Sequence, residues 1–321
     1  MLYNKGTFLK KFTNIVVKIF IIIISLIFIS AITHAVLLRV ERKKIIPNGI
    51  LTEINGHRLH IYAEGPINNR PALVFMSGGA TPAPVYDFKP LYSLFTDEYR
   101  IIVIERIGYG YSDIADTERD IGTILEETRG ALQSVREKGP FVLFPHSISG
   151  LEALSWLSKY PVEIAAIIGL DMGFPEYYIQ RKTPPLNIDQ MLMKYLAMLG
   201  IQRLYYPKQA DSSYFTEDEY KQMKDLTYRN FMNTSVLNEL KSIYSNAEIV
   251  HNQNYLNKTD NILLFSSNGK ERSNFWIHSK SEFAKKMEAK LIILDCDHYV
   301  HHFESQKIMK ISKQFLNEIL R

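Results

Sequence analysis

The chain has 321 residues, of which 46% are hydrophobic and 22% charged, a balance typical of a globular protein that excludes a disordered chain. It holds one cysteine, Cys296, so neither an intramolecular disulfide nor a cysteine-rich zinc site can form. The formal net charge is +4, but residues 1–44 carry eight basic residues against one acid, Glu41, so the rest of the chain is mildly acidic. This distribution gives no support to nucleic-acid binding through a basic face.

Residues 1–44 are predicted to form an N-terminal transmembrane anchor or signal segment. The run 19–38 contains 20 residues without a formal charge, and as a helix it would span roughly 30 Å, about the thickness of the hydrocarbon core. A cleaved signal peptide is the competing interpretation, since Thr33-His34-Ala35 loosely fits the cleavage pattern. The run exceeds the usual ~7–15-residue apolar region of a signal peptide. We therefore expect a single-pass, signal-anchor membrane protein whose body lies outside the cytoplasm, although the flanking basic residues are nearly balanced.

Short apolar runs alternate with helical patterns over most of the remaining chain. The first is a hairpin at 50–63 around Asn55-Gly56, a pair typical of a tight turn. Buried strands are then predicted at 72–76, 101–105, 141–144, 164–170, 262–265 and 291–294, and helices at 86–97, 120–138 and 151–160. Short, wholly apolar strands that alternate with helices indicate an α/β fold with a mostly parallel sheet and helices on both of its faces.

Between residues 174 and 258 the pattern changes to helical, aromatic-rich sequence without a predicted strand. We interpret 174–258 as a helical cap inserted into the sheet domain, whose core is then formed by 45–173 and 259–321. The tyrosines of this segment are candidates for a substrate pocket as a group, but each one singly is better explained by packing.

The segment Phe141-Val-Leu-Phe-Pro-His-Ser-Ile-Ser-Gly150 carries a predicted buried strand directly into a predicted helix. It resembles the nucleophile elbow, G-x-S-x-G, of the α/β-hydrolase superfamily. Residues two before and two after the nucleophile must be small, because they meet across the tight turn. Ser147 satisfies this with Pro145 and Ser149 as neighbours, whereas Ser149 would have the large Leu151. Ser147 is therefore the predicted nucleophile, with Pro145 as a departure from the superfamily's glycine.

Three further segments resemble the same superfamily in the same order along the chain. Residues 75–80, FMSGGA, occupy the place of the oxyanion-hole loop, with Ser77 where histidine is usual. Residues 105–113 resemble the stretch D-x-x-G-x-G-x-S, with Glu105 in place of aspartate and a structural role expected. Residues 295–301 resemble the stretch that carries the catalytic histidine, with Asp297 in place of glycine. The resemblance implies an oxyanion hole formed by the backbone N–H groups of Gly79 and Ile148.

Three histidines compete for the role of general base: His298, His301 and His302. The motif favours His298, the first after the last predicted strand, and the other two are assigned to packing or to the surface. A metal site at these histidines is disfavoured, because no carboxylate or further histidine cluster completes it in the sequence. Cys296 is not expected to be a nucleophile, because no Cys-His framework surrounds it.

The acid that orients the histidine has two candidates. The usual superfamily position follows the seventh predicted strand, where Glu271 is the only carboxylate close enough. A second position, used by part of the superfamily, is the end of the sixth strand, which here is Asp171. We favour Asp171, because Glu271 requires a register shift of about one residue. The predicted triad is therefore Ser147, His298 and Asp171.

The resemblance implies a serine hydrolase that cleaves an ester or amide bond, peptide bonds included, through an acyl-enzyme on Ser147. No cofactor or metal is expected. The expected partners are a small-molecule or peptide substrate and, through residues 19–38, the lipid bilayer. The sequence does not identify the substrate, because enzymes with many different substrates share this fold. The substitutions at Ser77, Pro145 and Asp297 support one alternative, a catalytically silent binding or sensing protein on the same fold.

Overall fold

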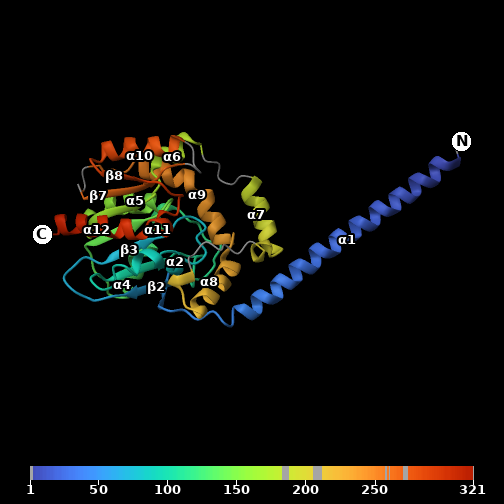
Figure 1. Ribbon diagram of the computed structural model, residues 1–321, viewed down its shortest axis with the longest axis horizontal. Coiled ribbons are helices and arrows are strands. Elements are labelled where there is room, and N and C mark those ends of the chain that lie inside the picture. Colours follow the sequence, from blue (N-terminus) through green and yellow to red (C-terminus); the bar gives the residue numbers. More distant parts are fainter. Residues whose placement is uncertain are drawn as a thin grey trace.

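The computed structural model describes residues 3–182, 188–204, 212–256, 259, 261–269 and 274–320. These residues form one long N-terminal helix and a sheet domain covered by helices (Figure 1). The strands are β1 Ile50–Ile54, β2 His57–Glu64, β3 Leu73–Met76, β4 Ile101–Glu105, β5 Phe141–Pro145, β6 Ile164–Leu170, β7 Ile262–Ser267 and β8 Lys290–Leu294. The α-helices are α1 Tyr3–Glu41, α2 Pro84–Asp87, α3 Lys89–Tyr92, α4 Ile121–Ser134, α5 Ser149–Lys159, α6 Pro175–Gln180, α7 Ile188–Met198, α8 Glu217–Asn230, α9 Thr234–His251, α10 Asn274–Lys286, α11 Val300–Phe303 and α12 Ser305–Ile319.

The eight strands form one sheet in the order β1-β2-β4-β3-β5-β6-β7-β8. Strand β2 runs antiparallel to β1 and to β4, and all the other neighbours are parallel. The hairpin between β1 and β2 turns at Asn55 and Gly56, both at positive φ (53° and 80°), as the sequence predicted. The predicted fold class, a mostly parallel sheet, is confirmed.

Two apolar cores lie on the two faces of the sheet. One joins the strands to α4, α5, α9 and α10, and the other joins them to α2, α3, α11 and α12. Every residue of the central strands β3, β4 and β5 is buried, because helices cover both faces. Because β3, β4 and β5 are parallel, their carboxyl ends lie at the same edge of the sheet. In parallel sheets of this kind the functional loops follow these carboxyl ends.

Two predicted helices differ from those observed. The helix expected at 86–97 is divided into α2 and α3 at Phe88, because Pro90 lacks the N–H that a continuous helix would need. The helix expected at 120–138 ends at Ser134. There, Arg136 adopts a positive φ of 62° and the Glu137 N–H donates to the Leu132 carbonyl at 3.0 Å, which closes the helix with a Schellman turn.

Helices α6 to α9 lie between β6 and β7 in the chain, and the described part of 174–258 contains no strand. Helix α9 lies along α6 and α5, whereas α7 stands away from the sheet beside the C-terminal half of α1 (Figure 1). Asn233 caps α9 by accepting a hydrogen bond from the Val236 N–H at 3.1 Å. This region is the one predicted as the cap.

Helix α1 projects from the domain as a single rod (Figure 1). Its segment Phe8–Glu41 is long and apolar enough to cross a membrane, with a mean hydropathy of 3.0 over the most apolar window and none of that window buried in the protein. Length and composition alone support this, and a signal sequence has the same properties.

Candidate active site

Ser147 lies on a sharp turn between β5 and α5. Its φ of 55° is in the left-handed region, which a residue with a side chain rarely occupies without compensating contacts. The turn is held by hydrogen bonds from the Ser149 N–H to the His146 carbonyl (3.2 Å) and from the Gly173 N–H to the Ser147 carbonyl (2.7 Å). A Cβ at Gly150 would overlap the Gly173 carbonyl. The strand–turn–helix setting predicted for Ser147 is thus present, and it leaves no room for larger residues.

The two serines of the turn have different surroundings. Ser149 is buried, and its hydroxyl faces the carbonyl oxygens of Met76 and His146, each at 2.8 Å. Ser147 is only partly buried, at the carboxyl end of β5. Of the two hydroxyls, the one on Ser147 is therefore the one that a substrate can reach.

His298 and Asp171 lie against each other at the same edge of the sheet. His298 is in the loop after β8, and Asp171 follows the last residue of β6 with a positive φ of 47°. The His298 Nδ1 lies 2.5 Å from the Asp171 Oδ2. With Nδ1 directed at the carboxylate, a proton taken up by the ring of His298 would enter at its other nitrogen, Nε2.

Asp171 is fully buried and surrounded by donors from β7 and α10. The Ser267 N–H and hydroxyl each lie 2.9 Å from its carboxylate, and the Trp276 indole N–H lies 3.2 Å away. The Lys280 amino group also contacts Asp171. Lys280 is itself buried, and burial holds the pKa of its amino group well below the usual value. Ser267, Trp276 and Lys280 were not singled out from the sequence, because nothing local links them to a carboxylate about a hundred residues earlier.

Glu271, the alternative acid, lies outside the described residues. What the structure does give is the pairing of Asp171 with His298, which is the arrangement that the sequence favoured.

The predicted oxyanion loop, residues 77–80, packs against the elbow. A Cβ at Gly78 would lie 3.1 Å from the Ser147 Cβ, and one at Gly79 would lie 3.0 Å from the Ile148 Cγ2. The glycines therefore permit a close approach of this backbone to Ser147. The loop is fixed from below by Tyr109, whose hydroxyl accepts a hydrogen bond from the Ala80 N–H at 3.0 Å.

Glu105 has the structural role expected of it. It is fully buried at the end of β4 and accepts hydrogen bonds from the backbone N–H groups of Val85 (3.1 Å) and Tyr111 (2.7 Å). Its carboxylate also lies 3.0 Å from the His60 Nδ1. A Cβ at Gly110, whose φ is 47°, would overlap this carboxylate. The turn beneath the oxyanion loop thus depends on both Glu105 and Gly110.

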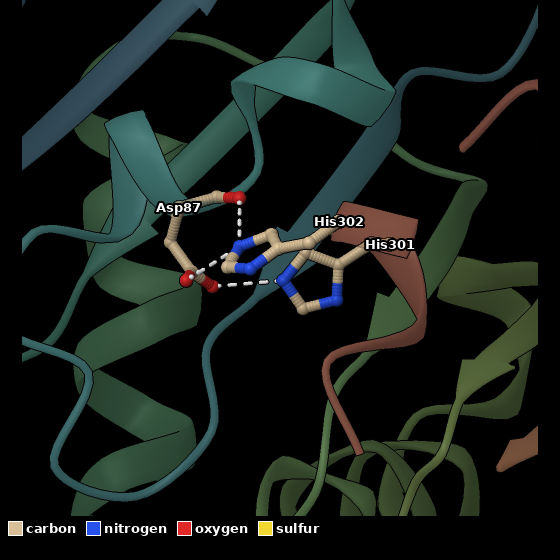
Figure 2. Close-up of side chains that lie close together, drawn as sticks. All are labelled: Asp87, His301 and His302. Carbon is tan, nitrogen blue, oxygen red and sulfur yellow. Dashed lines mark hydrogen bonds and ion pairs between the residues drawn. The ribbon is translucent and has the colours of Figure 1, made fainter. Parts of the chain in front are cut away.

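His301 and His302 both contact Asp87, at the end of α2 (Figure 2). The His301 Nε2 lies 2.9 Å from the Asp87 Oδ2, and the His302 Nε2 lies 3.0 Å from the Oδ1 and from the Asp87 carbonyl. The sequence pattern indicates no carboxylate partner for these histidines, and the fold brings one to them from Asp87. Both carboxylate oxygens are engaged by the imidazoles, so hydrogen bonding between α2 and α11 accounts for the cluster.

Burial and the contacts within this cluster shift the pKa values of Asp87, His301 and His302. Burial would raise the pKa of Asp87, but the two imidazoles outweigh it and hold that pKa well below its usual range. Burial lowers the pKa of His301, whereas for His302 the Asp87 carboxylate outweighs burial and raises the pKa.

Cys296, near His298 in the chain, is partly buried, and burial raises the pKa of its thiol to about 11. It is therefore a poor nucleophile.

Comparison with known proteins gives relatives by sequence and by structure. The chain is 32% identical over 284 residues to YbdG, an uncharacterized protein of Bacillus subtilis strain 168, covering 84% of this chain and 86% of that protein. An epoxide hydrolase from Bacillus megaterium superposes with a TM-score of 0.62 at 14% identity, covering 84% of this chain and all of that one. An enol-lactonase from Burkholderia xenovorans LB400 superposes with a TM-score of 0.56 at 15% identity, again over 84% of this chain and all of that one. No family model matches the sequence.

Proposed function

We propose that this chain, which has the α/β-hydrolase fold of the enol-lactonase and the epoxide hydrolase that superpose on it, is a serine hydrolase. The bond cleaved is an ester or an amide, and the reaction passes through an acyl-enzyme on Ser147. The pairing of His298 with the buried Asp171, at the sheet edge that also presents Ser147, is the observation that carries the proposal.

In the first step the Ser147 hydroxyl oxygen attacks the carbonyl carbon of the substrate while the His298 Nε2 takes its proton. Asp171 keeps the Nδ1 proton directed away from the serine and stabilises the imidazolium that forms. The tetrahedral oxyanion is stabilised by the backbone N–H groups of Gly79 and Ile148. It collapses by expelling the alcohol or amine, which receives the proton from His298. Water then attacks the acyl-enzyme by the same route, releases the acid and restores the Ser147 hydroxyl.

The hydroxyl at position 147 distinguishes this mechanism from the carboxylate-based chemistry that also occurs on this fold. A dehalogenase needs a carboxylate nucleophile, which Ser147 does not provide. Strain at Ser147 and the small residues around it support a nucleophile held out toward the substrate. Neither Pro145 nor Ser77 opposes this, since Pro145 lies within β5 and the loop beginning at Ser77 is needed only for its backbone.

The experiment is labelling of the full-length protein with a fluorophosphonate probe, followed by mass spectrometry of the labelled peptide. We expect the adduct on Ser147, its loss in Ser147→Ala, and its retention in the matched variant Ser149→Ala. Labelling of Ser149, or no labelling of a folded protein, would favour the silent binding or sensing protein on the same fold.

We also propose that α1 remains attached and holds the body outside the cytoplasm. The 34-residue apolar segment Phe8–Glu41 supports this. In fractionated cells the intact chain should sediment with membranes, and protease added to protoplasts should digest the body. A soluble product beginning near Val36 would instead show that the segment is a cleaved signal peptide.

A further inference from the structure

Helix α7 exposes an apolar surface that none of the described residues covers. Of its 11 residues only Ala197 is buried, and the side chains of Ile188 (82%), Leu192 (55%) and Met198 (60%) are largely exposed. Its exposed large apolar residues are Ile188, Met191, Leu192, Met193, Tyr195 and Met198. A contiguous exposed apolar surface of this kind on a folded protein marks an interaction site.

The end of α7 is attached to α1. The Ser30 hydroxyl donates a hydrogen bond to the Leu199 carbonyl at 2.8 Å. The next residue, Gly200, has a φ of 78°, and a Cβ there would lie 2.9 Å from the His34 Nδ1. The backbone therefore turns directly against α1 at a position where glycine is required by both conformation and space.

Polar groups hold this junction together. Arg203 makes two hydrogen bonds of 2.7 Å to the Glu41 carboxylate, and its Nε lies 2.9 Å from the His34 Nδ1. Its guanidinium also lies 4.3 Å from the centre of the Tyr228 ring. A paired, planar guanidinium of this kind fixes orientation as well as supplying energy. The position of α7 relative to α1 is thus set by specific contacts.

These contacts fix how deep α7 lies if α1 spans a bilayer. Ser30 precedes Leu38, the last residue of the uncharged run, by eight residues, which is roughly 12 Å along a helix. A segment attached at Ser30 cannot stand far above the surface of a membrane that contains residues 19–38. Four basic residues, Arg39, Arg42, Lys43 and Lys44, follow the run and are placed to meet lipid headgroups.

We propose that the apolar surface of α7 lies in the lipid bilayer that holds α1, in contact with acyl chains at the membrane interface. The occupant of this surface is lipid, because the contact at Ser30 is continuous with the surface of α1 between Ile19 and Ile32, where the exposed side chains are mainly large and apolar and none is charged. Helix α7 combines this apolar surface with two charged residues, Asp189 and Lys194, which at a membrane interface can remain among the lipid headgroups. The inference depends on α1 and is independent of the chemistry proposed for Ser147.

The test uses the full-length chain with Cys296→Ser as background, so that a single introduced cysteine can carry an environment-sensitive nitrobenzoxadiazole label. The test variant is Leu192→Cys. Ile24→Cys, in α1, is the control for a lipid-exposed position, and Val162→Cys is the control for a water-exposed one, since Val162 precedes β6 at the opposite edge of the sheet. Each protein is reconstituted in phosphatidylcholine–phosphatidylglycerol vesicles with and without doxyl-labelled lipid.

We expect the label at Leu192 to be blue-shifted and to lose fluorescence to the doxyl lipids, as the label at Ile24 does, whereas the label at Val162 is unaffected. The proposal is overturned if the label at Leu192 behaves like the label at Val162. It is also overturned if Leu192→Cys forms a disulfide between two copies of the chain in vesicles in place of lipid contact. A water-exposed label at Ile24 would overturn it as well, by removing the membrane from α1, and fluorophosphonate labelling of Ser147 would be unchanged by that result.

Discussion

Two regions of this molecule are rich in apolar residues, and they place these residues in opposite environments. Around Ser147, the strands β3, β4 and β5 bury every side chain between two layers of helices. In α1 and α7 the large apolar side chains are exposed. Polar groups are paired in both regions, Asp171 with His298 in the first and Arg203 with Glu41 in the second.

The difference shows that apolar composition alone does not say what a segment packs against. Buried apolar strands fix the positions of the loops at their carboxyl ends to within the tolerance that chemistry needs. Exposed apolar helices need another apolar environment, which we propose is the bilayer. The first region is therefore expected to respond to substitution through catalysis, and the second through the attachment of the protein to the membrane.

The largest effect is expected at Ser147. Ser147→Ala removes the proposed nucleophile and should lower the turnover of a p-nitrophenyl ester by on the order of 10⁶-fold, to background, with the fold intact. Ser149→Ala is the matched control and should retain turnover within about tenfold, because alanine is also small and only hydrogen bonds to backbone carbonyls are lost. The opposite ranking of the two variants would place the nucleophile at Ser149.

The next largest effect is expected at Asp171. Asp171→Asn keeps the size of the side chain but cannot stabilise the imidazolium of His298, so turnover should fall by on the order of 10⁴-fold. Glu271→Gln is the control and should have little effect. If Glu271→Gln were the more damaging of the two, the acid would lie after β7 and Asp171 would be structural. Thermal unfolding of both variants checks that the loss is not one of folding.

A smaller effect is expected at Lys280. Its amino group contacts the Asp171 carboxylate and has a pKa held low by burial. Lys280→Met removes one of the hydrogen-bond donors to the Asp171 carboxylate. The carboxylate then interacts more strongly with the His298 imidazolium, so the pKa of His298 rises. His298 must be neutral to act as a base, and the acidic limb of the pH–rate profile should therefore move to higher pH, by about one unit or tenfold in rate at low pH. An unchanged limb would make Lys280 only a packing residue.

The smallest effect is expected at the junction between α1 and the cap. A double-mutant cycle with Arg203→Met and Glu41→Gln should give a coupling energy of about 1 kcal/mol in unfolding measured in detergent. The pair Arg58–Asp113 is the matched control, because its arginine side chain is 61% exposed, and its coupling should be smaller. No coupling between Arg203 and Glu41 would mean that α7 is not held on α1 by this contact.

Much of this could be predicted from the sequence, because the signals are local. The strands are short apolar runs, the hairpin has its Asn55-Gly56 pair, and the elbow around Ser147 needs small neighbours within five residues of chain. Asp171 is favoured because part of the superfamily places its acid at the end of the sixth strand, and because Glu271 would require a register shift.

The features that were missed depend on residues far apart in the chain. Trp276 and Lys280 reach Asp171 from α10, and Asp87 contacts His301 from a position 214 residues earlier in the chain. No spacing rule connects such residues, since their contact is created by the order of the strands. The contact between α7 and Ser30 likewise joins residues far apart in the chain. It places α7 beside the predicted membrane helix, whereas the sequence indicates only that α7 is part of a helical cap.

The most direct test of the central claim is to trap the acyl-enzyme. The full-length protein is mixed with p-nitrophenyl acetate, quenched in acid within the first turnover, and examined by intact mass and peptide mapping. The account predicts a burst of p-nitrophenol with one acetyl group bound to Ser147, absent from Ser147→Ala. Turnover of the ester without any acetylated enzyme, or acetylation at another residue, would contradict it.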